Sequence, residues 1–285
     1  LHNLRRVARN QDRTFGVKLT NTLEVNNWKT VFDRDDMMYQ SGRALHPVTS
    51  NLGLRISEQF HGDLLMSFAG CADAFNVAHL ARSGMRTITT CSDILKSGGY
   101  MRMMQYTENL AAAMEDAGAT DMADFIAKTA VQEEGFAEFG PMLRLAALSD
   151  SGLALSLEDC TALGAALAAA IGPEPLMQAA RTWATGAGLD EARTDELVSV
   201  VMNVLERINL RSYANSVLSD RRYQKHTFRM DRSKTPRTLD YYDCIEAPCL
   251  DECPVDQKVP QYMNAVRDGD FAEAVRLTRT DNPMP

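Results

Sequence analysis

Three cysteines near the end of the chain have the residue type and spacing needed to hold a metal centre. Cys244, Cys249 and Cys253 follow a C-x4-C-x3-C pattern, and Pro254 comes directly after the last of them. Iron–sulfur clusters are held by cysteine thiolates, several of which come from one short loop while others arrive from elsewhere in the chain. The three thiols are therefore candidate ligands of an iron–sulfur cluster.

Zinc ligation and disulfide formation are alternative roles for these thiols. A structural zinc site usually combines two closely spaced pairs of Cys or His, and no second pair accompanies this segment in the sequence. Disulfides form in oxidising compartments, and nothing else in the sequence indicates such a compartment. Ordinary thiols without a metal are the remaining alternative.

The composition describes a chain that can bury a sizeable core. Of the 285 residues, 45% are hydrophobic and 24% are charged. The net charge of -8 argues against general binding to nucleic acids or anionic membranes. The most apolar run, residues 163–171, is too short to span a membrane, and the first residues lack the apolar region of a secretory signal. We therefore expect a cytoplasmic protein. Because the sequence starts at Leu1 and ends in a turn, we also expect an internal fragment.

Residues 1–110 alternate between short apolar runs and helical patterns. Strands are predicted at residues 15–20, 63–68 and 86–90, with helices at residues 47–60 and 73–83 between them. Strands that alternate with helices are typical of a parallel α/β architecture.

Small and polar side chains lie where these predicted strands end. In a (β/α)8 barrel this is where functional groups gather, and here the residues are Lys18, Asn21, Ser67, Gly70, Thr90 and Ser92. They could bind a phosphate, or Gly70 could serve only a tight turn and Ser92 only a helix cap. Lys18 either extends to water at the rim or holds an anionic or electron-rich group. Cys71 and Cys91 are more simply explained as small buried thiols.

The rest of the chain is predicted to be helical. Residues 197, 201, 204, 205 and 208 form one apolar helix face that follows a cap at Thr194, and packing explains this region better than catalysis. Residues 221–237 are strongly basic. They could be a solvated linker, stabilise the negative charge of a cluster, or dock a neighbouring domain. Few aromatic residues lie among them, which argues against binding to nucleic acid. Helices beginning at Pro260 and Asp270 form a hairpin after the cysteines.

Several motifs resemble known families. Ala247-Pro248-Cys249 with Cys253-Pro254, followed by Gly269-Asp270-Phe271 and Asn282-Pro283, resembles the iron–sulfur domain of dihydropyrimidine dehydrogenase and of the glutamate synthase small subunit. Residues 15–22, 38–45 and 93–100 are similar to the selenate reductase family of iron–sulfur flavoproteins. This family places a dihydroorotate-dehydrogenase-like barrel before the cluster domain, and an FAD and NAD(P)H unit after it.

The resemblance implies a fold in three parts. It is an α/β fold in which residues 1–110 are the C-terminal part of a flavin-type (β/α)8 barrel. Residues 111–237 lie outside the resemblance, and their own helical and basic patterns indicate a helical insertion with a basic linker. Residues 238–285 begin an all-α [4Fe-4S] domain. The implied partners are a downstream FAD and NAD(P)H domain of the same polypeptide and redox partner subunits.

The resemblance also implies electron transfer from NAD(P)H through FAD and the clusters to an acceptor. The lysine matching Lys18 contacts FMN in related barrels, and the loops matching Gly70 and Ser92 hold its phosphate. Here Ala69-Gly70-Cys71 replaces a loop richer in glycine, and Tyr241 replaces a cysteine of the relatives. Three cysteines cannot complete a four-cysteine cluster, so we expect the isolated chain to bind iron poorly and to be inactive.

Two other functions compete with this one, and no catalytic residue is assigned. The chain could be a non-catalytic barrel scaffold that docks partner subunits, or a zinc-stabilised interaction module. Bound flavin distinguishes the enzyme from the scaffold, and metal analysis distinguishes the zinc module from both.

Overall fold

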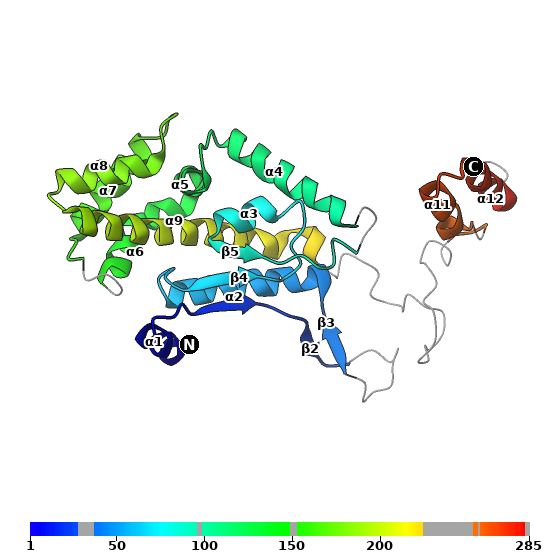
Figure 1. The fold of residues 1–285 in the computed structure, drawn as a ribbon, viewed down its shortest axis with the longest axis horizontal. Helices are drawn as coiled ribbons and strands as arrows, with labels where there is room; N and C mark the ends of the chain where they lie inside the picture. Colours follow the sequence, from blue (N-terminus) through cyan, green and yellow to red (C-terminus); the bar gives the residue numbers. More distant parts are fainter. Residues whose placement is uncertain (28–36, 96–98, 149–152, 225–252, 256, 283–285) are drawn as a thin grey trace. The chain divides into compact units, whose positions relative to one another are not determined.

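The chain forms two compact units in the computed structural model, which describes residues 1–27, 37–95, 99–148, 153–224, 253–255 and 257–282 (Figure 1). The first unit comprises residues 1–23 and 39–224, and the second comprises residues 24–38 and 225–285. The described part is mostly helical. It contains one three-stranded parallel sheet and a two-stranded sheet formed by β2 (Leu23–Val25) and β3 (Met38–Gln40).

The parallel sheet confirms the three strands predicted from the sequence. Strands β1 (Gly16–Leu19), β4 (Leu65–Phe68) and β5 (Met85–Ile88) lie in the order β1-β4-β5. Parallel neighbours need a crossover connection. Helix α2 (His46–Gln59) lies between β1 and β4 in the sequence, and α3 (Val77–Arg82) lies between β4 and β5. Within the described residues the sheet has three strands and does not close into a barrel.

The two faces of this sheet differ in burial. Leu19, Met66, Phe68 and Met85 point to one face and are buried in a core shared with α2 and the long helix α9. The opposite face is more open, and its exposed members are Gly16, Lys18, Leu65 and Thr87. Side chains alternate between faces along a strand, so one face of the sheet holds the core and the other meets solvent in this structure.

Helix α3 begins later than predicted. The pattern predicted a helix from residue 73, but α3 starts at Val77. The carboxylate of Asp73 accepts hydrogen bonds from the N–H groups of Phe75 and Asn76, and the Asn76 side chain accepts one from the Asp73 N–H. Asp and Asn side chains often hold the backbone in such turns instead of in a helix.

Helix α9 (Glu191–Ser219) joins two hydrophobic cores (Figure 1). Its first half carries the predicted apolar face, Leu197 to Ile208, into a core with α5, α6, α7 and α8. Its second half, through Leu210, Tyr213 and Val217, enters the core under the parallel sheet. The predicted start at Thr194 is wrong, because Asp190 is the N-cap and accepts a hydrogen bond from the N–H of Arg193.

The described residues of the first unit also form further helices and short 3-10 turns. Residues 111–224 belong to the same compact unit as residues 1–23 and 39–110, while the predicted domain boundaries at 110 and 237 stay a prediction. The helices are α1 (His2–Asn10), α4 (Arg102–Asp116), α5 (Met122–Gln132), α6 (Phe139–Ala146), α7 (Leu157–Ala169) and α8 (Leu176–Gly186), with 3-10 turns η1 (Gly42–Leu45), η2 (Gly99–Met101), η3 (Glu134–Glu138) and η5 (Arg221–Tyr223).

The described residues of the second unit include a helical hairpin, as predicted. Helix α11 (Val259–Arg267) has Pro260 in its first turn, and α12 (Phe271–Asp281) is capped by Asp270. Gly269 makes the turn with a φ of 78°, a conformation that glycine adopts without strain. Among the described helices, none combines the length and the apolar character needed to cross a membrane.

Candidate functional site

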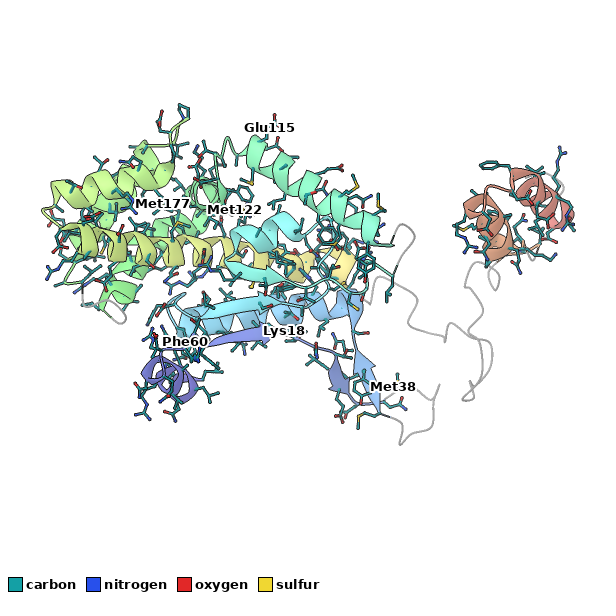
Figure 2. All side chains as sticks on the ribbon, in the orientation of Figure 1. Lys18, Met38, Phe60, Glu115, Met122 and Met177 are labelled. Carbon is teal, nitrogen blue, oxygen red and sulfur yellow. The ribbon has the colours of Figure 1, made fainter. Side chains whose placement is uncertain are left out.

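The ends of the parallel strands bring two of the predicted site residues together. Lys18 is opposite Ser67 in the register of β1 and β4, and the Thr87 hydroxyl of β5 donates to the Ser67 hydroxyl at 2.5 Å. Lys18, labelled in Figure 2, is exposed on the open face of the sheet. Thr87 is exposed on the same face. Asn21 and Ser92 are exposed as well. The structure therefore forms a polar row across three strands, and the roles predicted for its residues stay predictions.

Gly70 lies in a tightly packed loop after β4. It is buried, and a Cβ added to it would lie 2.8 Å from the Thr49 Cγ2 atom of α2 and closer still to other Thr49 atoms. Its carbonyl oxygen accepts a hydrogen bond from His46 Nδ1 at 2.7 Å. Gly70 thus allows α2 to approach the strand end, and its carbonyl is directed at a protein side chain.

A chain of buried hydrogen bonds continues from this loop. Since the Gly70 carbonyl can only accept, His46 Nδ1 carries the proton, and His46 Nε2 accepts from the Tyr213 hydroxyl at 2.6 Å. The Tyr213 and Tyr223 hydroxyls are 3.5 Å apart, and Asn76 Nδ2 donates to the Tyr223 hydroxyl at 3.3 Å. His46 also stacks on Tyr223 at 4.4 Å between ring centroids. Burial lowers the pKa of His46 and raises that of Tyr213, so both stay neutral.

This cluster was not predicted, because its members come from α2, the N-cap of α3, α9 and η5, which are far apart in the sequence. No spacing pattern connects residue 46 to residue 213. The only local signal was a histidine beside Pro47 at the start of a predicted helix, which by itself indicates nothing about function.

The loop after β5 is closed by a second polar cluster. Asp93, which is 1% exposed, accepts hydrogen bonds from Arg102 Nε at 3.2 Å and from the Tyr106 hydroxyl at 3.0 Å. The predicted site residue Thr90 bonds to the Tyr106 hydroxyl at 2.9 Å and donates to the Ala72 carbonyl. Burial, with the nearby Asp93, raises the pKa of Tyr106 to about 12. Thr90 therefore serves the packing of α4 against the two strand-end loops.

The described strand-end loops carry two buried carboxylates, Asp73 and Asp93, which would disfavour a bound phosphate. A phosphate group needs N–H donors and cations, but Asp73 already accepts the N–H groups of Phe75 and Asn76. Asp93 likewise takes the guanidinium of Arg102. Both carboxylates are buried, and a phosphate beside them would be repelled in a poorly hydrated site. Among the described residues, the two carboxylates therefore disfavour a phosphate at these strand ends, and the FMN contacts suggested by the sequence stay a prediction.

The cysteines outside the 244–253 segment vary in their surroundings. Cys71, in the left-handed region with a φ of 64°, is half-buried, and Cys91 is exposed, so the expectation of buried thiols fails at Cys91. Cys160 is buried in the helical core, which raises its pKa to about 11. Among the described residues, no three His, Cys, Asp or Glu side chains are grouped to hold a metal.

Cys253 is the described member of the predicted metal-binding set, while Cys244 and Cys249 lie outside the described residues. Its Sγ atom accepts a hydrogen bond from the Gln257 N–H at 3.3 Å. Such N–H···S bonds stabilise the negative charge of thiolates that ligate clusters. The thiol is half-buried at the entrance of the α11–α12 hairpin. This donor and its surroundings fit a thiolate ligand.

Two family models match parts of the chain. Residues 1–136 match the family described as oxidoreductase YgfK, N-terminal TIM-barrel domain, and residues 222–285 match dihydropyrimidine dehydrogenase domain II, 4Fe-4S cluster. The chain is similar to YgfK-type iron–sulfur oxidoreductases. The first match is compatible with an α/β class, although the three described parallel strands are fewer than a full barrel requires.

Two curated relatives cover the whole chain. The YgfK proteins of Escherichia coli strains K12 and O157:H7 are each 26% identical to it over 285 residues. The chain spans 19% of the length of these YgfK relatives. No solved structure matches the chain.

Proposed function

We propose that the chain is part of a longer iron–sulfur oxidoreductase that relays electrons between an NAD(P)H- and FAD-binding unit and an acceptor. The observation that carries the proposal is Cys253. Its thiol accepts an N–H bond at the start of a helical hairpin, inside the segment that matches a 4Fe-4S domain. The acceptor is left unassigned, because selenate in the name of the resembling family is only a label, and assaying selenate reduction by the full-length polypeptide tests whether that label describes the acceptor.

Cys244, Cys249 and Cys253 are the proposed ligands that this chain supplies. A [4Fe-4S] cluster, when bound, accepts and releases single electrons. The protein's own part is to supply thiolates, fix their positions and shield them from water. Since a cluster of this type takes four ligands and this segment offers three cysteines, the remaining ligands are expected from other parts of the polypeptide.

We assign the first unit a structural role in this relay, which is the scaffold function considered from the sequence. Its strand-end loops are filled by His46 and Tyr213 and carry the buried carboxylates Asp73 and Asp93, so no electron is routed through an FMN there. The open face of the parallel sheet, with Lys18 and Leu65, is the surface that further strands of the longer polypeptide would cover.

The deciding experiment is purification of the full-length polypeptide without oxygen, followed by iron, sulfide, zinc and flavin analysis. Iron with acid-labile sulfide, and FAD without FMN, are the expected results. Zinc without iron overturns the electron relay and favours an interaction module. FMN in addition to FAD overturns the structural role of the first unit and restores Lys18 as a candidate flavin contact.

A further inference from the structure

The turn that carries Cys253 is tied to the end of α12. Gln257, whose N–H donates to the Cys253 sulfur, is 8% exposed, and its Nε2 atom donates to the Thr278 carbonyl at 3.3 Å. Thr278 lies in the last turns of α12. One residue thus contacts the thiol through its backbone and the hairpin through its side chain.

A second set of hydrogen bonds, between Lys258 and Asp281, lies directly beside the first contact. The Lys258 N–H donates to Asp281 Oδ2 at 3.1 Å, and Lys258 Nζ donates to Asp281 Oδ1 at 2.6 Å. These hydrogen bonds to Lys258 lower the pKa of the Asp281 carboxyl, which therefore stays ionised at neutral pH. The contacts of Gln257 and Lys258 both join residues 257–258 to residues 278–281. The packed hairpin therefore fixes the direction of the Gln257 N–H.

The two helices of the hairpin pack closely against each other, so the hairpin can hold these contacts in place. The N–H of Asp270 donates to the Ala265 carbonyl at 2.8 Å across the turn, and Ala265 and Ala274 are buried between the helices. Small residues at a helix contact allow close approach of the two backbones. An amide held by this hairpin has little freedom to swing away from the sulfur.

We propose that Gln257 is a positioning residue for the Cys253 thiolate ligand, an inference that rests on the proposed electron relay. Its side-chain bond to Thr278 aims its own N–H at Sγ. An N–H···S bond stabilises the more negative, reduced form of a cluster and raises its reduction potential. Outer contacts that orient a ligand also affect how firmly the metal is held. Gln257 therefore raises the potential and retains the iron.

The test uses the full-length polypeptide with Gln257→Met, which keeps the side-chain length and removes the donor to Thr278. Gln261→Met is the matched control, because Gln261 is exposed on α11. We expect Gln257→Met to shift one cluster to a more negative potential in a redox titration followed by electron paramagnetic resonance. It should also lose iron to a chelator about tenfold faster and exchange the 257–260 amides faster. Gln261→Met should match the unsubstituted protein in all three.

Unchanged potential and iron loss in Gln257→Met overturn the positioning role. If that variant fails to fold, Lys258→Met removes the side-chain half of the neighbouring contact with Asp281, and the same two readouts decide. Lack of iron and sulfide in the unsubstituted protein is a separate result: it overturns the proposed electron relay itself, and the positioning role with it. Full iron content with no effect of either variant leaves the relay standing and removes only the role of Gln257.

Discussion

The hydroxyl of Tyr213 donates a hydrogen bond to His46 Nε2 at 2.6 Å, and both side chains are buried. The two residues are 167 positions apart, so this bond joins the start of α2 to the second half of α9. His46 Nδ1 holds the Gly70 carbonyl at the same time. One imidazole thus links the strand-end loop of β4 to the helix that crosses both hydrophobic cores.

We expect Tyr213→Phe to lower the free energy of unfolding by about 1–3 kcal/mol, the usual cost of leaving a buried hydrogen-bonding partner unsatisfied. Phenylalanine keeps the ring that stacks on His79 at 4.9 Å, so the loss reports the hydroxyl alone. Tyr100→Phe is the control, because Tyr100 is 81% exposed, and it should change stability by less than about 0.5 kcal/mol. Equal urea midpoints for the two variants contradict the prediction.

Acid should destabilise the first unit through two histidines, His46, which is buried, and His79, which is half-buried. Burial lowers the pKa of His46, and burial together with the Arg82 guanidinium lowers that of His79 from 6.5 to about 4. Below pH 6.5 these histidines therefore become protonated in the unfolded chain, while they stay neutral in the folded chain until a lower pH. Stability is fully present above pH 6.5 and falls as the pH drops towards 4, by at most about 1.4 kcal/mol per pH unit for each histidine.

The measurement is urea unfolding at several pH values between 7 and 4. His79→Gln should flatten this pH dependence, because one of the two groups that take up protons on unfolding is removed. His61→Gln is the comparison, since the half-buried His61 lies outside the cluster of His46, His79 and Tyr213. A slope that is the same in His79→Gln and in the unsubstituted protein refutes the assignment.

Gly70 should resist substitution for reasons of packing. Gly70→Ala would place a methyl group against Thr49, and overpacking of this kind costs about 1–3 kcal/mol. Gly186→Ala is the matched control, because nothing lies within 4 Å of its added Cβ and it ends helix α8. Alanine there should be neutral or stabilising by up to about 1 kcal/mol. Thermal unfolding that ranks the two variants in the reverse order contradicts this packing argument.

The sequence predicts the local elements well, because periodicity and end signals act locally. Strands β1, β4 and β5 and the α11–α12 hairpin follow from apolar runs, Pro260, Gly269 and Asp270. Errors came where two local signals competed. Asp190 and Thr194 are both acceptable caps, and α9 uses the earlier one, so that Thr194 lies inside the helix.

The site was harder to predict, because its chemistry depends on contacts between distant segments. Gly70 and Thr90 were recognised as strand-end residues, but a phosphate site and a packed loop have the same local sequence. The difference comes from His46 and Tyr106, which reach these loops from elsewhere in the chain through tertiary folding. The Gln257 contact with Thr278 was equally hidden, since it joins residues 21 positions apart.

The open face of the parallel sheet should become buried in the longer polypeptide that we propose. All-parallel sheets are almost always covered on both faces, yet Leu65 is 41% exposed and Lys18 is exposed on this face. We expect the amides of residues 16–19 to exchange more slowly in the full-length polypeptide than in the 285-residue chain. The physical reason is that a further strand would pair with the outer edge of β1.

Leu65→Asp tests the same burial by its cost. It should be close to neutral in the 285-residue chain, and it should lower the stability of the full-length polypeptide by about 2–4 kcal/mol, because a carboxylate would enter a covered face. Ile171→Asp is the control, since Ile171 is 48% exposed in a loop between α7 and α8, and it should be near neutral in both. Equal effects of Leu65→Asp in the two chains would mean that this face stays open to solvent.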